Sequence, residues 1–294
     1  MIVARLEQGR FHILDRYRAM VRLAAGLNSR NGLDMATQVR AFEALKEFQM
    51  RLRHVPVSHV RVVGTSALRS LSEKHSFVKA ASNILGLPID IIPGSEEARL
   101  INLGVDGVMK KKEGEGARLV IDIGGASTEI LIGDGPKILA AESLSMGCVP
   151  FSQRFFPDGQ ITERLFEEAR REAENLADPV FERFKDIGWL DVIGTSGTIK
   201  TIRKMITLQG WGDKEITPEA VHKVTDAVVS AGHLENLQEL RGLPHDRIRA
   251  FPGGLAILES IMHRFGIPRM RISKAAMREG ILLDLARNKD YTSS

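Results

Sequence analysis

The sequence predicts an α/β protein made of two similar lobes, and three observations lead to this prediction. Short runs rich in Val and Ile alternate along the chain with longer segments whose apolar residues recur every three or four positions. The segment Val62–Ser66 returns almost unchanged at Val192–Ser196, an offset of 130 residues. The length of 294 residues accommodates two domains of ordinary size. Alternating strands and helices favour layered packing, and the repeat favours a duplicated domain.

Each expected element follows from its local pattern. Runs bounded by Gly, Pro and Asp predict strands at Ile2–Leu6, Phe11–Leu14, Val60–Val63, Ile89–Ile92, Leu119–Ile123, Glu129–Ile132, Ile138–Ser143 and Leu190–Ile193. Helical periodicity predicts helices at Asp34–Leu52, Ser72–Leu85, Thr162–Phe184, Thr217–Leu240, Ile257–Phe265 and Ala275–Leu285.

A second match supports the duplication. Ile2–Ala4 falls beside Ile130–Ile132 at nearly the same offset, and both strands run into a Gly-containing turn and a second strand. The charged, Gly-rich stretch Lys110–Gly116 lies between the halves and is interpreted as a hinge, although a surface loop within one domain is the alternative. We therefore expect an N-terminal lobe over residues 1–113 and a C-terminal lobe over residues 114–294.

The composition is that of a globular protein without a membrane span. The hydrophobic fraction is 43%, the charged fraction is 27%, and there is no run of about eighteen apolar residues. The first ten residues carry charges and no apolar signal core, so a cytoplasmic location is expected. The single cysteine, Cys148, excludes an intramolecular disulfide and a cysteine-based zinc cluster.

Arginine dominates the first sixty residues, although the formal net charge is only +4. A basic surface favours an anionic partner, either a polyanionic substrate or nucleic acid, and a solvated face without a partner is the third possibility. Two Trp and two Tyr offer little base stacking, so no specific nucleic acid is expected. The arginines are Arg5, Arg10, Arg16, Arg18, Arg22, Arg30, Arg40, Arg51 and Arg53.

The strongest candidate site is the segment Asp122–Glu129. A buried strand ends near Asp122, and Gly124 and Gly125 then allow a tight turn whose backbone N–H groups can point at a phosphate. Hydroxyl groups follow directly, and carboxylates flank the turn on both sides. Both carboxylates could hold Mg²⁺, directly or through water. A generic hairpin would account for the glycines but not for the carboxylates and hydroxyls around them.

Other segments carry weaker signals. The acids Glu96 and Glu97 open a helix after a strand, where they suit the helix N-terminus and need no catalytic role. Gly194–Thr198 follows a strand and precedes a helix, so it is a plausible second phosphate-binding loop, with Gly64–Arg69 as its counterpart. Phe251–Leu255 is expected to be a strand-to-helix glycine turn, which could line a nucleotide pocket or allow close packing.

These segments together resemble the exopolyphosphatase / guanosine pentaphosphate phosphohydrolase family, in its short two-domain form. The matching motifs occur in family order over nearly the whole chain. They are Gly64–Arg69, Gly94–Ala98, Asp122–Glu129, Ser145–Val149, Gly194–Thr198, Pro252–Leu258 and Met277–Gly280. The resemblance implies a duplicated ribonuclease-H-like fold, the actin-like superfold, with the active site in a central cleft.

The resemblance also implies roles for individual residues. Glu97 would be the catalytic base that activates water, Arg69 would grip the phosphate chain, and Asp122 and Glu129 would hold Mg²⁺ or another divalent cation. Phosphate would be bound by Gly124, Gly125, Ala126, Ser127, Thr128, Gly194, Thr195, Ser196, Gly197 and Thr198.

The chain departs from the family pattern in two places. Ala126 replaces a family glycine, and its methyl group could crowd a phosphate if φ is positive there. The family's first strand and acidic Gly-Ser phosphate loop would precede Met1, so we expect the first lobe to lack them.

The expected activity is release of terminal orthophosphate from inorganic polyphosphate. The alternatives are hydrolysis of guanosine pentaphosphate by the same groups and a non-catalytic module that binds polyphosphate or a nucleotide. A sugar or acetate kinase of the same superfold is disfavoured by the motif set. A homodimer is possible.

Overall fold

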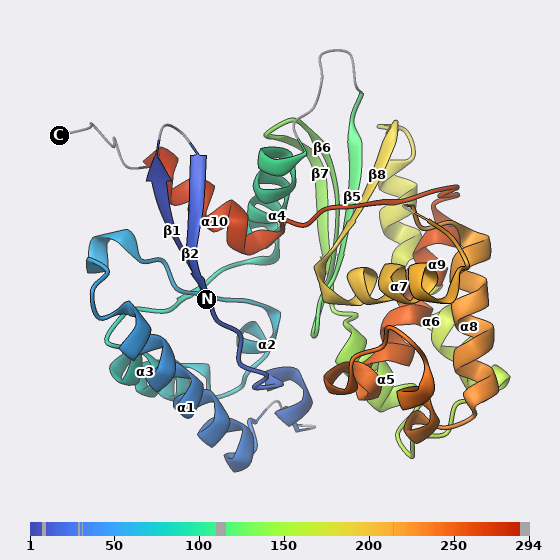
Figure 1. The fold of residues 1–294 in the computed structure, drawn as a ribbon, viewed down its shortest axis with the longest axis horizontal. Helices are drawn as coiled ribbons and strands as arrows, with labels where there is room; N and C mark the ends of the chain where they lie inside the picture. The colour runs from blue at the N-terminus through green and yellow to red at the C-terminus, as the bar shows by residue number, and fades with distance from the viewer. Residues whose placement is uncertain (8–9, 29, 31, 110–115, 214, 289–294) are drawn as a thin grey trace. The chain divides into compact units, whose positions relative to one another are not determined.

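The computed structural model describes residues 1–7, 10–28, 30, 32–109, 116–213 and 215–288, which fall into two compact units (Figure 1). Unit 1 comprises Met1–Gly104 together with Met277–Ser294, and unit 2 comprises Val105–Ala276. The division expected at residues 113 and 114 differs from this, because the last helix belongs to unit 1 and the boundary lies inside a helix. The predicted hinge at 110–116 falls, except for Gly116, outside the described residues.

Unit 1 contains two separate small sheets and the helices packed on them. β1 and β2 form an antiparallel hairpin, whereas β3 and β4 are a short parallel pair. The strands are β1 (Ile2–Glu7), β2 (Arg10–Arg16), β3 (Val63–Gly64) and β4 (Asp90–Ile91). The helices are α1 (Met35–Leu52), α2 (Ser66–Arg69), α3 (Lys74–Leu85), α4 (Gly94–Val108) and α10 (Met277–Asn288), with 3-10 turns at Leu23–Gly26 and Val57–His59.

Close packing between α4 and α10 explains why the end of the chain joins unit 1. A Cβ added at Gly280 would lie 1.8 Å from the carbonyl oxygen of Leu100, so only glycine permits this approach. Asp284 of α10 also accepts hydrogen bonds from Arg61, at 2.7 Å, and from Arg99, at 2.9 Å. The two helices lie side by side in Figure 1.

Unit 2 is built on one five-stranded sheet in the order β7-β6-β5-β8-β9. β5 lies in the middle, antiparallel to β6 and parallel to β8. The strands are β5 (Arg118–Ile123), β6 (Thr128–Asp134), β7 (Lys137–Leu144), β8 (Asp191–Thr195) and β9 (Arg271–Ile272). The helices are α5 (Cys148–Phe155), α6 (Glu163–Phe184), α7 (Ser196–Gln209), α8 (Pro218–Ala231) and α9 (Phe251–Arg264), with 3-10 turns η3 (Leu234–Glu239) and η4 (His245–Ala250).

The buried core of unit 2 explains why β5 is so regular a strand. All six residues of β5 are buried, because one face packs on α7 and α9 and both edges are paired. A strand buried on both faces requires the nearly continuous apolar run that the sequence has at 119–123. The carboxyl end of β5 is therefore a rigid place from which the chain can present a loop.

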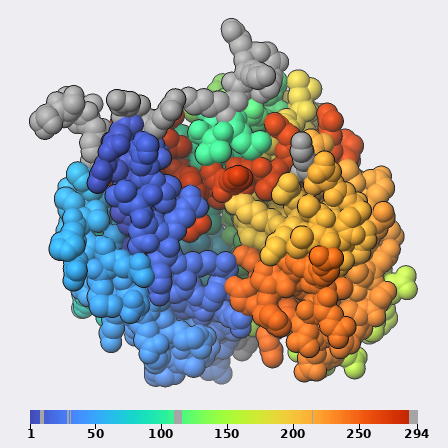
Figure 2. Space-filling model, viewed as in Figure 1, coloured from blue at the N-terminus to red at the C-terminus, as the bar shows by residue number. Residues whose placement is uncertain are grey.

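Unit 1 repeats the order of unit 2 but not its central strand. The hairpin β1-β2 matches β6-β7, and the parallel pair β3-β4 matches β8-β9. Among the described residues of unit 1, no strand joins the hairpin to the parallel pair as β5 does in unit 2. The consequence is visible in burial: Ile130, Leu131 and Ile132 are 0% exposed, whereas the matching positions of β1 are only half-buried. Figure 2 shows the hairpin, in dark blue, on the surface.

The unpaired edges of β1 and β3 lead to a testable expectation. Joining a copy of Arg118–Ser127 directly ahead of Met1 should supply a strand between them and pair their free backbone groups. We expect the melting temperature to rise by about 2 °C or more, since about 1 kcal/mol moves Tm by 2–4 °C in domains of 150–250 residues. The control is the same extension with proline at two alternate positions, which cannot pair. Equal melting temperatures for both extensions would contradict the expectation.

Most predicted elements are confirmed, but several differ in extent, among them the strand predicted at Ile89–Ile92, which is reduced to the two residues of β4. The helix predicted over Thr217–Leu240 ends at Ala231, because Gly232 adopts a left-handed φ of 71° and terminates α8. The strand predicted at Val60–Val63 is reduced to the two residues of β3. No helix in the described part of the chain is both long and apolar enough to cross a membrane.

The predicted strand-to-helix turn at Phe251–Leu255 is also wrong, since these residues form the first turn of α9. Their glycines serve close packing. A Cβ at Gly253 would lie 2.5 Å from the amide nitrogen of Ser152, and one at Gly254 would lie 2.5 Å from Cγ2 of Thr198. Of the two roles considered for this segment, the geometry supports packing.

Candidate functional site

The turn between β5 and β6 presents open backbone amides. The amide of Gly124 donates to the carbonyl of Ser127 at 2.9 Å, which closes the turn. Within the described residues, the amides of Gly125, Ala126 and Ser127 have no protein acceptor. Ala126 is not among the described residues with positive φ, so its methyl group causes no backbone strain. Three adjacent N–H groups without a protein acceptor are typical of an anion-binding turn, which is the role that the sequence predicts here.

The N-terminus of α5 fixes the other side of this turn. The amides of Cys148 and Val149 donate to the carbonyls of Gly124 and Gly125, each at 3.0 Å. A Cβ at Gly147 would lie 2.4–2.5 Å from the backbone of Ala126, so a side chain there would displace the turn. Because the turn's carbonyls face α5, they leave its amides for a ligand. Gly147 is a positioning residue that sequence reasoning did not assign, although it lies in a motif that was noted.

Asp122 and Glu129 stand directly opposite each other in the β5–β6 ladder. Residues opposite in an antiparallel pair share one face of the sheet, with Cβ atoms about 4.5–5.5 Å apart. Asp122 is 7% exposed and Glu129 is 2% exposed. The hydroxyl of Ser143 donates to Oε1 of Glu129 at 2.8 Å. Two carboxylates on neighbouring strands repel when both are ionised, so a cation bound between them would be stabilised by both.

This pair fits a divalent cation of the magnesium type. Carboxylate oxygens are the hard ligands that Mg²⁺ prefers, and Mg²⁺ is usually held by one or two carboxylates with waters and substrate phosphates completing the shell. In the part of the chain that the structure describes, no group of three or more His, Cys, Asp or Glu side chains forms an all-protein site. Asp122 and Glu129, two carboxylates beside a glycine turn, match the kind of site in which waters and substrate phosphates complete the Mg²⁺ shell.

The second predicted loop, Gly194–Thr198, connects β8 to α7, but its hydroxyls serve the fold. Oγ1 of Thr195 donates to the carbonyl of Ala275 at 2.9 Å, and Oγ of Ser196 donates to the carbonyl of Ile123 at 2.6 Å. In the first loop, Oγ1 of Thr128 likewise donates to the carbonyl of Met146. The hydroxyl of Thr128, one of the hydroxyls that the sequence suggests as phosphate donors, is thus engaged within the fold, and the backbone amides that the sequence predicts as phosphate donors in both loops remain candidates.

The N-terminus of α7 remains available to an anion. Its N-cap, Thr195, makes no side-chain hydrogen bond to the helix amides, because its hydroxyl is used elsewhere. Ser196 has a φ of 70°, an uncommon value for a residue with a side chain. Backbone strain of this kind concentrates at functional sites. The hydrogen bond from Ser196 to the end of β5 holds the start of α7 close to the glycine turn.

Unit 1 brings two of the predicted site residues, Arg69 and Glu97, into contact. Nη1 of Arg69 donates to Oε2 of Glu97 at 2.9 Å and to the carbonyl of Ile92 at 2.8 Å. The side chain of Thr65, the N-cap of α2, also hydrogen-bonds the Glu97 carboxylate. Glu97 lies in the first turn of α4 and is only 7% exposed. Both predicted residues thus form one buried, oriented group.

Burial gives Glu97 the character of a base. Desolvation raises the pKa of Glu97 above its ordinary value, and the hydrogen bond and charge of Arg69 partly offset this effect. A carboxylate with a raised pKa accepts a proton more readily at neutral pH than an exposed one. The preceding residue, Glu96, is in a different environment. Its pKa is lowered, first by the hydrogen bond from Arg99.

Replacing Arg69 should move the pH profile of activity. Arg69→Met removes the cation that lowers the Glu97 pKa, so that pKa rises further and deprotonation needs a higher pH. We expect the acid limb of kcat/KM to shift upward, beyond the already raised position of the unsubstituted chain. Arg69→Lys keeps a positive charge and should shift the limb less. If both variants keep the acid limb at the pH seen for the unsubstituted chain, Arg69 does not influence the ionisation of Glu97.

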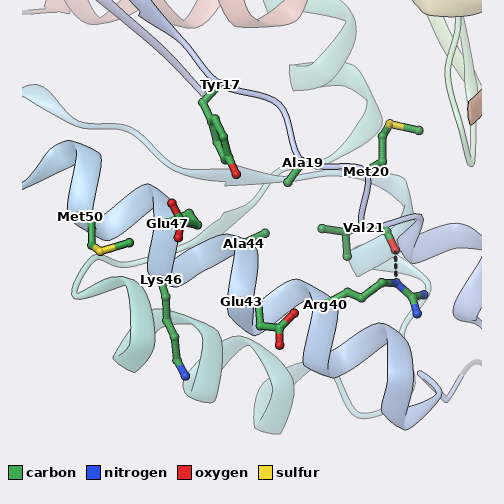
Figure 3. A pocket seen from close by; sticks show the side chains of 10 residues that line it. All are labelled: Tyr17, Ala19, Met20, Val21, Arg40, Glu43, Ala44, Lys46, Glu47 and Met50. Atoms are coloured by element: carbon green, nitrogen blue, oxygen red, sulfur yellow. Dashed lines mark hydrogen bonds between the residues drawn. The ribbon is translucent and has the colours of Figure 1, made fainter.

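A surface hollow of about 630 Å³ lies in unit 1, between residues 17–21 and α1 (Figure 3). Arg40 in its wall donates through Nε to the carbonyl of Val21 at 3.3 Å. Glu43, Lys46 and Glu47 also line it, so together with Arg40 the hollow carries two positive and two negative side chains and offers a polyanion no excess of positive charge. The hollow contains none of the predicted site residues.

These features define an α/β protein of the duplicated ribonuclease-H-like, actin-like fold. The family model that matches it, over residues 2–289, is that of the Ppx/GppA phosphatase family. The chain belongs to this family. The fold class and the family resemblance predicted from the sequence are thereby confirmed.

Relatives and solved structures agree with this assignment. The chain is 38% identical to the guanosine-5′-triphosphate,3′-diphosphate pyrophosphatase of Vibrio parahaemolyticus over 97% of its own length, and 37% identical to that of Vibrio cholerae over 98%. It covers 56% and 57% of those proteins, so it spans a little over half their length. An exopolyphosphatase from Cytophaga hutchinsonii has the same fold, with a TM-score of 0.85, 21% identity, and 99% and 95% of the two chains covered. A family member from Aquifex aeolicus has a TM-score of 0.79 at 22% identity, with 99% and 94% covered.

Proposed function

We propose that this chain hydrolyses the terminal 5′-phosphoanhydride bond of guanosine 5′-triphosphate 3′-diphosphate, guanosine pentaphosphate. The observation that carries the proposal is the Gly124–Ser127 turn, whose three open amides adjoin the opposed carboxylates Asp122 and Glu129. A phosphoryl group needs such donors, because negative charge on its oxygens must be stabilised during transfer. The Vibrio relatives, named for this nucleotide, favour it over inorganic polyphosphate as the substrate.

The side chains divide the work of the reaction. Glu97 would take a proton from water, whose oxygen attacks the terminal phosphorus, and the bridging oxygen leaves with the nucleotide. The products would be orthophosphate and the tetraphosphate nucleotide. Arg69 would orient Glu97 through its hydrogen bond. Amides of the glycine turn and of the start of α7 would bind phosphoryl oxygens. A Mg²⁺ ion held by Asp122 and Glu129 would supply charge neutralisation when bound.

The test compares orthophosphate release from guanosine pentaphosphate and from long-chain polyphosphate, with and without Mg²⁺. We expect Mg²⁺-dependent release with a higher kcat/KM for the nucleotide. Binding of either compound without release would instead identify a non-catalytic module. Release of orthophosphate from polyphosphate but not from the nucleotide would instead support the second candidate, exopolyphosphatase activity.

The second candidate is exopolyphosphatase activity, which the Arg-rich first sixty residues favour. Part of this charge is already neutralised within the described residues. Arg5 pairs with Glu7 at 3.2 Å, and Arg51 pairs with Asp15 at 3.0 Å. These pairs reduce the attraction for a polyanion, so the structure gives this candidate less support than the sequence does.

Salt dependence measures the contribution of these arginines. If they bind long polyphosphate, each contact releases counterions, and affinity should fall about tenfold or more between 50 and 200 mM salt. The measurement is the dissociation constant of fluorescent long-chain polyphosphate over this range. A flat salt dependence would show that the basic surface is solvated and has no polyanionic partner.

A further inference from the structure

A buried carboxylate on α10, that of Asp284, binds two arginines at once. Nη1 of Arg61, ahead of β3, donates to Oδ2 of Asp284 at 2.7 Å, and Nη2 of Arg99, in α4, donates to Oδ1 at 2.9 Å. Glu96 accepts hydrogen bonds from the same two arginines, at 3.3 Å from Arg61 and at 2.7 Å from Arg99. Glu96 and Arg99 both belong to α4, so it is Asp284 that joins α10 to the arginine of α4.

The close backbone contact between the same two helices lies one turn away from this carboxylate. A Cβ at Gly280 would lie 1.8 Å from the carbonyl oxygen of Leu100, the residue after Arg99. Gly280 and Asp284 are four residues apart, so they face the same side of α10. α10 thus holds α4 at two points, by backbone contact at Leu100 and by the ion pair at Arg99.

Two points of contact fix the rotation of α4 about its own axis, which a single contact would not fix. Glu97 lies two residues before Arg99, in the first turn of α4. A rotation of about 20° would move a side-chain atom that is about 5 Å from the helix axis by about 2 Å. A misplacement of about 1 Å can cost about 10²-fold in rate. The direction of the Glu97 carboxylate therefore depends on how firmly α10 holds α4.

The hydrogen-bond partner of Glu97 is also supported by α10. Nη1 of Arg69 donates to Glu97 at 2.9 Å and to the carbonyl of Ile92 at 2.8 Å. Ile92, directly after β4, packs with Ile281 of α10 in one buried cluster. The same helix therefore contacts the segment that holds Arg69 and the helix that carries Glu97.

We propose that Asp284 is a positioning residue of the reaction, which holds Arg99 and so fixes the first turn of α4 and the direction of the Glu97 carboxylate. This inference rests on the proposed function, since it takes Glu97 as the base that accepts a proton from water. Asp284 acts through α4 and not on the substrate. The alternative is an ion cluster that only stabilises unit 1, which would leave the ionisation of Glu97 unchanged.

The first test compares Asp284→Asn with Glu96→Gln, which disturbs the same arginines but keeps the ion pair between Asp284 and Arg99. Asparagine keeps the size of the side chain, but one of the two acceptors becomes a donor that faces a guanidinium. We expect Asp284→Asn to lower kcat for orthophosphate release from guanosine pentaphosphate about 10- to 100-fold, with little change in KM. Glu96→Gln should lower kcat no more than a few-fold, and Asp284→Glu, which keeps both acceptors, should recover part of the loss.

The ionisation of Glu97 is the measurement that a purely stabilising role would not change in this direction. Removing a negative charge near a carboxylate lowers its pKa, whereas losing the hydrogen bond and charge of Arg69 raises the pKa of Glu97. We expect the acid limb of kcat/KM to move upward in Asp284→Asn, against the effect of charge removal alone. If Asp284→Asn melts at a lower temperature but shares the kcat and the acid limb of Glu96→Gln, Asp284 only stabilises the fold and the inference is wrong.

Two further measurements cover the failure of a variant or of the proposed function. If Asp284→Asn does not fold, Arg99→Gln breaks the same contact from α4 and should show the same loss of kcat and the same upward shift. The proposed function fails separately, if the unsubstituted chain releases no orthophosphate. NMR titration of the Glu97 carboxyl group in isotope-labelled protein then decides, with the resonance assigned by its absence in Glu97→Gln. Its pKa should be higher in Asp284→Asn than in Glu96→Gln, and equal values would overturn the inference.

Discussion

Glu97→Gln should lower turnover by about 10²- to 10⁴-fold, the usual contribution of a positioned general base, while KM changes little. Glutamine keeps the shape of the side chain and can still accept the hydrogen bond from Arg69, now at 2.9 Å to Oε2. It cannot accept a proton from water. The measurement is steady-state orthophosphate release at saturating nucleotide, with binding of the substrate measured independently.

The stability of this variant provides a second, independent measurement. Because burial raises the pKa of Glu97, ionising it costs stability, and the folded chain becomes less stable as pH rises through that raised pKa. Glu97→Gln removes this cost. We therefore expect an unchanged or higher melting temperature at neutral pH. Turnover near that of the unsubstituted chain would remove Glu97 from the mechanism.

The matched control is Glu96→Gln, one residue earlier on α4 and about 100° away around the helix. Glu96 accepts from Arg99 at 2.7 Å and from Arg61 at 3.3 Å, and both arginines also bind Asp284. Turnover should change by no more than a few-fold, but stability should fall. Since the pKa of Glu96 is lowered by folding, its contribution is present above the ordinary glutamate pKa and is lost as pH falls through the lowered value. The difference in melting temperature should shrink accordingly in acid.

The local sequence pattern was sufficient to predict the strands and helices that are deeply buried. β5 needs an apolar run because both of its faces are covered, and α6 shows its buried stripe from Phe166 to Phe184 in the spacing of its apolar residues. The local pattern does not predict which strands pair with each other. The run Val60–Val63 is typical of a strand, yet only Val63 and Gly64 pair, because a strand on the other side is absent among the described residues of unit 1. No local signal carries that information.

The candidate site also has features that the sequence predicts and features that it does not predict. The glycine turn and its carboxylates are contiguous in sequence, so their chemistry could be predicted before their geometry was known. The hydroxyl of Thr128 suggested a phosphate donor, but the carbonyl of Met146, 18 residues away, accepts its hydrogen bond. The approach of Arg247 to Gly197 could not be predicted, because it joins residues 50 positions apart in the sequence.

Asp122→Asn should raise the Mg²⁺ concentration needed for half-maximal activity by at least about 10- to 100-fold, the loss typical even of indirect metal contacts. Asp122 is 7% exposed at the end of β5, and Glu129 stands opposite it. An amide oxygen is a weaker Mg²⁺ ligand than a carboxylate, so the charge that attracts the cation is halved. Glu129→Gln should have a smaller effect, because the hydrogen bond from Ser143 already occupies one of its oxygens.

Melting in the absence of substrate tests this site without relying on activity. A ligand that binds only the folded chain at 100 times its dissociation constant stabilises it by about 2.7 kcal/mol, so Mg²⁺ should raise the melting temperature of the unsubstituted chain. The melting temperature of Asp122→Asn should depend on Mg²⁺ differently. It removes the repulsion between two buried carboxylates, so it should be more stable than the unsubstituted chain without Mg²⁺ and should gain little when Mg²⁺ is added. Asp134→Asn, at the exposed end of the same strand β6, is the control and should keep the full response to Mg²⁺. If Asp122→Asn also keeps it, the cation is not held by this pair.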